Sequence, residues 1–132
     1  QVVARRVRFP VESKLMKEIT RLSPLHYPPP DDTGRISTQV NLINLGNTQI
    51  LTIPGEALPN IGSYLKRKMK GEHNLLFGLT NDAFGYILTK VDFGSFRRYE
   101  YVSRTSLGEM TGEILIERSL EFVDKCPKPD GK

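Results

Sequence analysis

A glutamate stands directly after a strand-like run, at a turn that would hold its carboxylate rigidly. The segment Ile53-Pro54-Gly55-Glu56 ends a run of β-branched residues, and a helical pattern begins behind it. This order delivers Glu56 to the carboxyl end of a strand, where open α/β folds gather ligands. The structural alternative is a glutamate that only stabilises the first turn of the following helix through the helix dipole.

A tyrosine follows the next apolar run, 30 positions further along the chain. The segment 78–87 leaves an apolar stretch through an Asn-Asp turn and returns with Gly85-Tyr86-Ile87. Gly85 permits a close approach of the backbone, and Tyr86 would present its phenol at the same sheet edge as Glu56. The alternative is a buried tyrosine with a hydrogen-bonded hydroxyl. A phenol, whose ordinary pKa is about 10, becomes a metal ligand only when the field of a cation removes its proton.

A third polar segment, Arg98-Tyr99-Glu100, has as its alternative an edge strand with a surface ion pair of little energetic value. The sequence lacks a P-loop and the patterns G-x-G-x-x-G, G-x-S-x-G, C-x-x-C and H-E-x-x-H. Two histidines, His26 and His73, and the single Cys126 cannot complete an ordinary closed zinc site. We therefore expect this chain alone to lack some of the residues that any catalytic site would need.

The patterns around these segments predict a single α/β domain, with a mixed β-sheet and helices packed against it. Alternation of β-branched and apolar residues predicts strands at Val2–Phe9, Arg35–Leu45, Thr48–Ile53, Asn74–Thr80, Gly85–Thr89 and Tyr99–Val102. Apolar residues three and four apart predict helices at Val11–Leu22, Ala57–Lys70 and Leu107–Asp124.

The segments between these elements are also predicted by their residue types. Gly46-Asn47 is expected to be a hairpin turn, and the proline-rich segment 26–34 a loop. The nearly continuous apolar run at 74–80 favours a strand covered on both faces. Residues 125–132 are expected to form a disordered tail.

Composition limits the classes of protein that the chain can belong to. It has 132 residues, of which 38% are hydrophobic and 26% are charged, so extensive disorder is excluded. No apolar run approaches the roughly 18 residues of a transmembrane helix. The single cysteine excludes an internal disulfide, which favours a reducing, cytoplasmic location. The chain begins with Gln1 rather than Met, and we expect it to be part of a longer protein.

The net charge of +4 comes from three clusters of Lys and Arg, at residues 5–8, 66–70 and 97–98. Nucleic-acid binding through the densest cluster, Lys66 to Lys70, is one possible function. That cluster falls at the end of a predicted helix, where cations are stabilised by the macrodipole without a ligand. We therefore expect no nucleic-acid partner.

Taken together, the three polar segments resemble a known family. Ile53-Pro54-Gly55-Glu56, the segment 78–87 and Tyr99-Glu100, in this order and at about this spacing, are similar to the later part of the catalytic domain of neutral/alkaline (non-lysosomal) ceramidases. The resemblance extends over roughly residues 9–123 and is strongest at 48–106. It implies a mixed α/β fold holding one zinc ion, bound by two histidines from the earlier half of the chain and by a glutamate and a tyrosine from the later half.

Matched residue by residue, the resemblance places the zinc-binding glutamate at Glu56 and the zinc-binding tyrosine at Tyr86. It places at Tyr99 a second tyrosine, which stabilises the charge that develops in the transition state. Neither His26 nor His73 stands in a context that matches the histidine motifs of the family, and the family's serine has no counterpart here. The spacing from Tyr86 to Tyr99 is about one residue longer than is usual in the family, so we expect an N-acyl amide substrate rather than ceramide in particular.

The resemblance implies that the chain is the C-terminal portion of a ceramidase-like zinc amidohydrolase acting on an N-acyl amide or lipid-like substrate. The isolated chain would be inactive, because an upstream half of the same polypeptide supplies the histidines. A separate hypothesis is a stand-alone binding or oligomerisation module that keeps only the fold. Removal of the upstream half would expose a sheet edge and an apolar face, so we expect the isolated chain to form a homo-oligomer.

Overall fold

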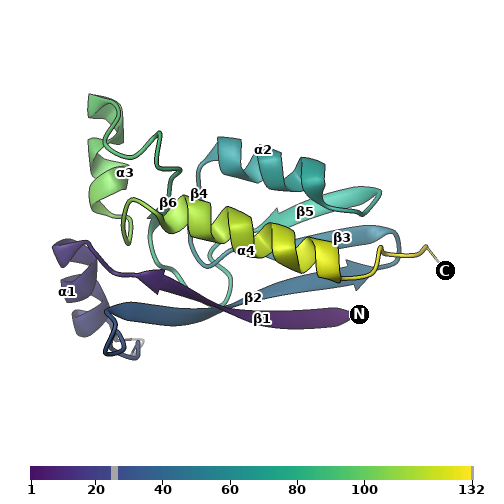
Figure 1. The fold of residues 1–132 in the computed structure, drawn as a ribbon, viewed down its shortest axis with the longest axis horizontal. Helices are drawn as coiled ribbons and strands as arrows, with labels where there is room; N and C mark the ends of the chain where they lie inside the picture. Colours follow the sequence, from purple (N-terminus) through teal and green to yellow (C-terminus); the bar gives the residue numbers. More distant parts are fainter. Residues whose placement is uncertain (25–26, 132) are drawn as a thin grey trace.

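The computed structural model describes residues 1–24 and 27–131 and has the predicted mixed α/β architecture (Figure 1). Within these residues the strands are β1 Val2–Pro10, β2 Arg35–Leu45, β3 Thr48–Thr52, β4 Glu56–Ala57, β5 His73–Phe77 and β6 Tyr86–Ile87. The helices are α1 Lys14–Leu22, α2 Pro59–Lys68, the 3₁₀ turn η1 Arg97–Tyr99, α3 Glu100–Arg104 and α4 Thr111–Lys125.

The main sheet has the strand order β1-β2-β3-β5. The first three strands are antiparallel, and β5 joins β3 in parallel after the crossover through α2. The hairpin between β2 and β3 turns at Gly46, whose positive φ of 56° suits a residue without a Cβ atom. The mixed sheet and its hairpin are thus confirmed.

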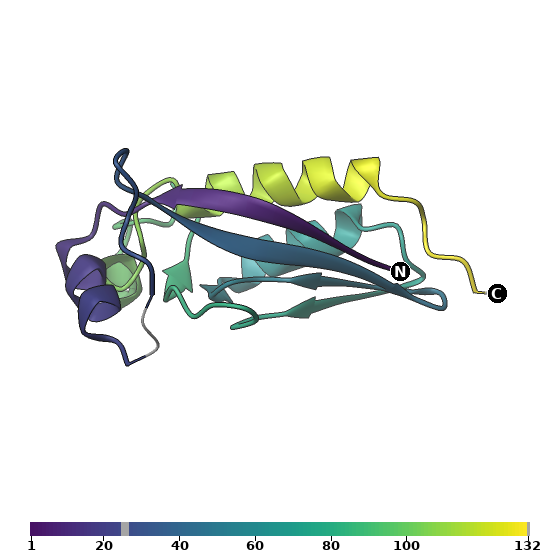
Figure 2. The same ribbon diagram turned by 90° about the horizontal axis from the view of Figure 1, so that it is seen from below.

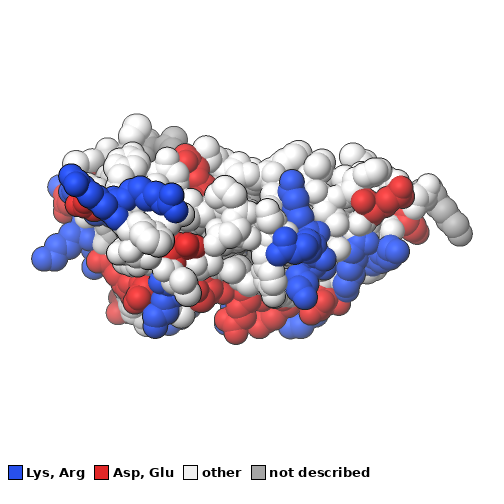
Figure 3. Space-filling model, turned by 90° about the horizontal axis from the view of Figure 1, so that it is seen from above, with Lys and Arg blue, Asp and Glu red and all other residues white. Residues whose placement is uncertain are grey.

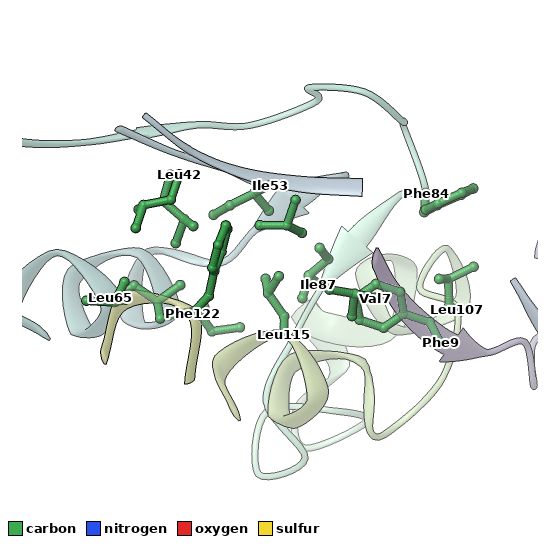
Figure 4. Close-up of a cluster of buried hydrophobic side chains, with 14 of the residues drawn as sticks. Val7, Phe9, Leu42, Ile53, Leu65, Phe84, Ile87, Leu107, Leu115 and Phe122 are labelled. Carbon is green, nitrogen blue, oxygen red and sulfur yellow. The ribbon is translucent and has the colours of Figure 1, made fainter. Parts of the chain in front are cut away.

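Helices α2 and α4 lie side by side on one face of the main sheet, whereas α1 and α3 lie at the end of the molecule away from both termini (Figures 1 and 2). Alternating residues of β1, such as Val7 and Phe9, point from the sheet into the layer beneath the helices. Leu65 of α2 and Leu115 and Phe122 of α4 meet them there (Figure 4). Each of these side chains contributes about 2 kcal/mol through burial, so this layer is the hydrophobic core.

A second, much smaller sheet joins β4 and β6 in parallel. Its strands have two residues each, and it lies beyond the end of β3, between the start of α2 and the segment that leads to α3 (Figure 1). This position brings together two segments that are distant in sequence, one carrying Glu56 and the other carrying Tyr86.

The predicted strand at Tyr99–Val102 is wrong. Arg97–Tyr99 is a 3₁₀ turn and Glu100–Arg104 is an α-helix, with the Tyr99 N–H donating to the carbonyl of Phe96 at 2.8 Å. Within the described residues no strand lies alongside this segment. Its backbone donors therefore find partners within the segment itself, which favours helical turns.

Several element boundaries also differ from the predictions. The strand at 74–80 ends at Phe77, and its alternate residues Leu75 and Phe77 are 41% and 48% exposed, so the predicted cover on both faces is wrong. Helix α2 begins at Pro59 rather than Ala57, because proline is suited to the first helical position and forces Leu58 before it into an extended conformation. Glu56 therefore lies in β4 and not in the first turn of a helix.

The C-terminal segment after α4 is irregular but makes contacts with the rest of the molecule. The Asn44 amide donates to the carbonyl of Pro127 at 3.1 Å, and Pro129 is buried. The Lys70 ammonium donates to the carbonyls of Asp124 and Cys126 at 2.9 and 3.3 Å, which stabilises the end of α4. None of the described helices is long and apolar enough to cross a membrane.

Candidate functional site

The Pro54-Gly55-Glu56 turn is held by backbone hydrogen bonds on both sides. The carbonyls of Pro54 and Gly55 accept from the N–H groups of Phe84 and Leu79 at 2.9 and 3.1 Å. The Glu56 N–H donates to the carbonyl of Gly85 at 2.9 Å. The turn therefore presents the Glu56 carboxylate from a backbone that is fixed at each residue.

Two glycines make this close approach possible. A Cβ atom on Gly55 would lie 2.5 Å from the Gly85 carbonyl oxygen. Gly85 has a φ of 77°, and a Cβ atom there would lie 2.0 Å from the carbonyl oxygen of Thr105. Any side chain at Gly85 would displace backbone atoms, so glycine is required by both space and conformation.

Glu56 and Tyr86 are directly paired in the small sheet. β4 and β6 run parallel with Glu56 opposite Tyr86, and the Tyr86 N–H is fixed in turn by the Thr105 carbonyl at 3.1 Å. This pairing sets the two side chains next to each other, and the Glu56 carboxylate, through hydrogen bonding and its negative charge, raises the pKa of Tyr86 above its ordinary value. The carboxylate and the phenol predicted from the sequence therefore do converge.

This contact also decides between the structural alternatives stated for the two residues. Glu56 is exposed and outside the first turn of α2, so its place does not come from the helix dipole. Tyr86 is partly exposed, and its partner is a carboxylate rather than a backbone group in the core. Neither residue is used to build the hydrophobic core.

A third aromatic residue, Tyr101 of α3, packs against this pair. Its ring meets that of Tyr86 nearly edge to face, with centroids 5.9 Å apart and an interplanar angle of 70°. Sequence analysis missed Tyr101 because it assigned the segment to a strand. A helical assignment would have separated Tyr101 from Tyr99, because residues two apart point to the same side of a strand but to different sides of a helix.

Tyr99, the third residue predicted from the sequence, lies in η1 with different neighbours. Within the described chain its ring contacts are with Phe96, at a centroid distance of 6.0 Å, and with the guanidinium of Arg98, at 5.1 Å. Arg98 thus covers aromatic faces, and the surface ion pair considered for the segment 98–100 is absent from the recorded ion pairs of the described residues. The structure joins Glu56 with Tyr86 and places Tyr101, rather than Tyr99, against them.

The donor set is suitable for part of a metal site. A carboxylate and a phenol both offer oxygen, and zinc accepts oxygen donors at about 2.0 to 2.2 Å. Among the described residues, no group of three or more His, Cys, Asp and Glu side chains could hold a metal. His73 is an exposed residue of β5 beside Glu72, and His26 lies outside the described residues. Glu56 and Tyr86 thus offer two oxygen donors, whereas a catalytic zinc ordinarily uses three protein ligands.

The basic residues of the central cluster lie where the sequence predicted. Lys66, Arg67 and Lys68 form the last turn of α2. Seen from above, the Lys and Arg side chains gather in separate groups, one at the left end and others in the right half of the view, with uncharged and acidic side chains between them (Figure 3). This face lacks the continuous basic stripe that a nucleic-acid backbone would follow.

Searches for related proteins support the resemblance at the level of the fold. No protein-family model and no curated protein sequence matches the chain. Among solved structures, neutral ceramidase from Pseudomonas aeruginosa is similar, with a TM-score of 0.53 and 16% sequence identity over 74% of this chain. A ceramidase complexed with C2 gives the same TM-score, identity and coverage of this chain.

The chain spans only a small part of these ceramidases, 17% of the first and 16% of the second. Its fold is therefore that of a ceramidase segment, and the resemblance stated from the sequence is confirmed in this respect.

Proposed function

We propose that this chain is the region of a ceramidase-like hydrolase that supplies Glu56 and Tyr86 to a zinc site, where an N-acyl amide bond is cleaved. The observation that carries the proposal is the pairing of these two residues across β4 and β6, which sets the phenol and the carboxylate next to each other. The likeness of the fold to neutral ceramidase supports the class of reaction. The remaining ligands would come from another part of the complete protein.

Each residue has a distinct task in this proposal. Zinc, when bound, supplies the Lewis-acid chemistry that activates water for attack on an amide carbon. Glu56 provides a negative charge from a fixed turn. Tyr86 keeps its proton at Oη beside the Glu56 carboxylate in the absence of metal, and would give this proton up to solvent on becoming a ligand. Metal affinity should therefore rise with pH.

The two further tyrosines have separate proposed tasks. Tyr99 would donate a hydrogen bond to the oxyanion that forms at the amide carbonyl. Tyr101 would hold the ring of Tyr86 in its orientation through the edge contact. Replacement of Tyr99 by Phe should lower kcat with little change in zinc content, whereas replacement of Tyr101 by Ala should lower zinc content.

Exposed apolar side chains near the pair support a lipid-like substrate. Leu79 is 54% exposed, and its N–H is bonded to the Gly55 carbonyl, one residue before Glu56. Tyr101, in contact with Tyr86, is 67% exposed. Such side chains would lie alongside an acyl chain better than alongside a charged substrate.

The test is zinc content and hydrolysis of an N-acyl amide by the complete protein with Glu56→Gln or Tyr86→Phe. Both variants remove one ligand with minimal change in shape, so each should lose most of its zinc and at least about 100-fold in activity. Glu100→Gln and Tyr64→Phe, which change the same residue types elsewhere, serve as controls and should retain both properties. Undiminished zinc in both Glu56→Gln and Tyr86→Phe would refute the proposal.

A second candidate function, an oligomerisation module, is favoured by one observation. The edge strand β5 exposes Leu75 and Phe77 on a face without cover from the described chain. Pairing of this face with a second copy would bury both side chains. Light scattering should then give the mass of a dimer, which Phe77→Lys should convert to that of a monomer. A single-subunit mass for the unchanged chain at micromolar concentration would exclude this function.

A further inference from the structure

The first strand, β1, leaves one row of backbone groups unpaired. Gln1 and Asn44 exchange two hydrogen bonds, of 2.9 and 2.8 Å, and the Val11 N–H donates to the Gly34 carbonyl at 3.0 Å. Both pairs continue the antiparallel register of β1 and β2 without a break, because the two residue numbers of every pair have the same sum. Hydrogen-bonded pairs alternate with non-bonded pairs along such a ladder.

Odd-numbered residues of β1 are therefore bonded to β2, and even-numbered ones direct their N–H and C=O groups to the open side. Among these are Ala4, Arg6 and Arg8, for whose backbone groups no partner is recorded within the described residues. All three residues are exposed. An added strand would find its donors and acceptors here already aligned.

A groove of about 560 Å³ follows this open edge, between β1 and α4. Figure 1 shows the two elements running alongside each other, and Figure 2 shows α4 next to β1 from below. Its apolar lining comes from Val7 and Val40 on the sheet and from Ile114 and Phe122 on the helix. The helix face from Ile114 to Lys125 is about 16 Å long, which is about five residues of a strand.

The walls of the groove are strongly cationic. Its lining includes two carboxylates, Glu117 and Glu121, and six cationic residues, Arg5, Arg6, Arg8, Arg35, Arg118 and Lys125. Arg118 is paired with Glu121 at 3.1 Å, and Arg8 lies 4.0 Å from Asp31. Within the described residues the remaining four cations have no recorded carboxylate partner, and the Arg5 guanidinium lies over the ring of Phe122 at 5.9 Å.

We propose that this groove binds an extended acidic peptide segment, which adds to β1 as a further strand. The unpaired edge would bond the peptide backbone, the apolar lining would take alternate side chains, and the free cations would pair with its carboxylates. This surface is separate from Glu56 and Tyr86, and its function does not depend on the proposed zinc site.

Two other occupants fit the groove less well. A nucleic acid offers few donors to the open carbonyls of β1, and Glu117 and Glu121 would repel its phosphates. A second copy of β1 would bring Arg5, Arg6 and Arg8 against the same residues of its partner, and like charges directly opposite destabilise a strand pair. An acidic strand satisfies the backbone and the charges together.

The first experiment uses a capped five-residue peptide of Glu and Val, titrated into the isotope-labelled full chain at low salt. Binding should slow hydrogen exchange of the Arg6 and Arg8 amides, which face the open edge, and leave that of the Val7 amide, already bonded to β2, nearly unchanged. A peptide with Lys in place of Glu should not bind. An N-methylated acidic peptide keeps the charges but loses the backbone donors, so its affinity should be lower by about tenfold.

A pair of variants tests the edge from the side of the protein. Arg6→Gln and Arg6→Pro remove the same charge, but only the proline removes the outward N–H, and proline is tolerated at such a position of an edge strand. Arg6→Pro should bind the acidic peptide about fivefold more weakly than Arg6→Gln. Lys66→Gln, which removes a charge from the end of α2, should bind as the unchanged chain does.

Several results would overturn the proposal. These are equal affinity of the N-methylated and ordinary acidic peptides, unprotected Arg6 and Arg8 amides at saturation, and tighter binding of a duplex oligonucleotide to the same residues. If the chain is a dimer and these amides are already protected from hydrogen exchange without peptide, the edge of β1 binds a second copy of the chain instead. If Arg6→Pro fails to fold, the comparison of the two peptides on the unchanged chain decides.

Discussion

The two sheets of this molecule are stabilised in different ways. The main sheet has long ladders and a hydrophobic layer beneath α2 and α4, in which side chains such as Leu51 are fully buried. The small sheet of β4 and β6 has two residues per strand and is held by backbone hydrogen bonds that its N–H groups donate to the carbonyls of Gly85 and Thr105. Its residue Glu56 is exposed, so packing contributes little to its position.

This difference separates the scaffold from the site. A large buried area tolerates many apolar sequences, since volume and pattern suffice for its stability. The small sheet instead depends on particular glycines, because backbone atoms approach each other too closely for a side chain. A fixed backbone then presents polar side chains to solvent, which is the requirement for a site that binds a ligand.

The largest effect should come from the core of the main sheet. Leu51→Ala removes a fully buried side chain and should lower the free energy of unfolding by about 4 kcal/mol. Leu75→Ala on the neighbouring edge strand, 41% exposed, should cost about 1 kcal/mol. Urea denaturation of both variants measures these values, and equal costs would contradict the contrast between centre and edge.

The small sheet should be most sensitive at Gly85. Gly85→Ala combines a positive φ with a Cβ atom 2.0 Å from a backbone oxygen, and should cost about 3 kcal/mol. Gly94→Ala is the matched control, because Gly94 has a φ of 65° and open space around it, and should cost about 1 kcal/mol. If both variants lose the same stability, the close approach to Thr105 does not matter.

A smaller effect should distinguish the two tyrosines after β6. Tyr101→Ala removes the edge contact with Tyr86 and should cost about 1 kcal/mol, with a clear shift in the ring resonances of Tyr86. Tyr99→Ala removes a ring packed on Phe96 and Arg98, and should leave the Tyr86 resonances in place. Shifts of Tyr86 in the second variant and not in the first would reverse this assignment.

Much of the scaffold could be predicted from the sequence because its residues repeat a pattern. β1, the hairpin of β2 and β3, and α4 contain alternating or helical apolar positions that only one face can bury. Tyr99–Val102 was misassigned because its aromatic and β-branched residues favour a strand, whereas no neighbouring strand exists in the described chain to pair with it. Propensity therefore failed where tertiary pairing decides.

The candidate site was predicted in part for a similar reason. Glu56 and Tyr86 stand at turns that follow apolar runs, and the resemblance to ceramidases indicates both residues from the sequence alone. The parallel bridge between them has two residues per strand, too few for any periodic pattern. Tyr101 enters through a helix of five residues, which leaves no clear signal in the sequence.

The smallest effect concerns pH. A phenol whose pKa is raised in the folded chain is favoured there in its protonated form, so its contribution to stability is fully present below the ordinary pKa of about 10. It is lost as the pH rises through the raised value. The stability difference between the unchanged chain and Tyr86→Phe should thus be constant near neutral pH and diminish in strongly alkaline solution.

The central claim is that the Glu56 carboxylate and the Tyr86 phenol are in direct contact, and the pKa of Tyr86 tests it most directly. NMR of chain labelled at the tyrosine ring carbons, without metal, should give a Tyr86 pKa above about 10 that returns toward this value in Glu56→Gln. Glu100→Gln should leave it raised. A Tyr86 pKa at the ordinary value, unchanged by Glu56→Gln, would contradict the account.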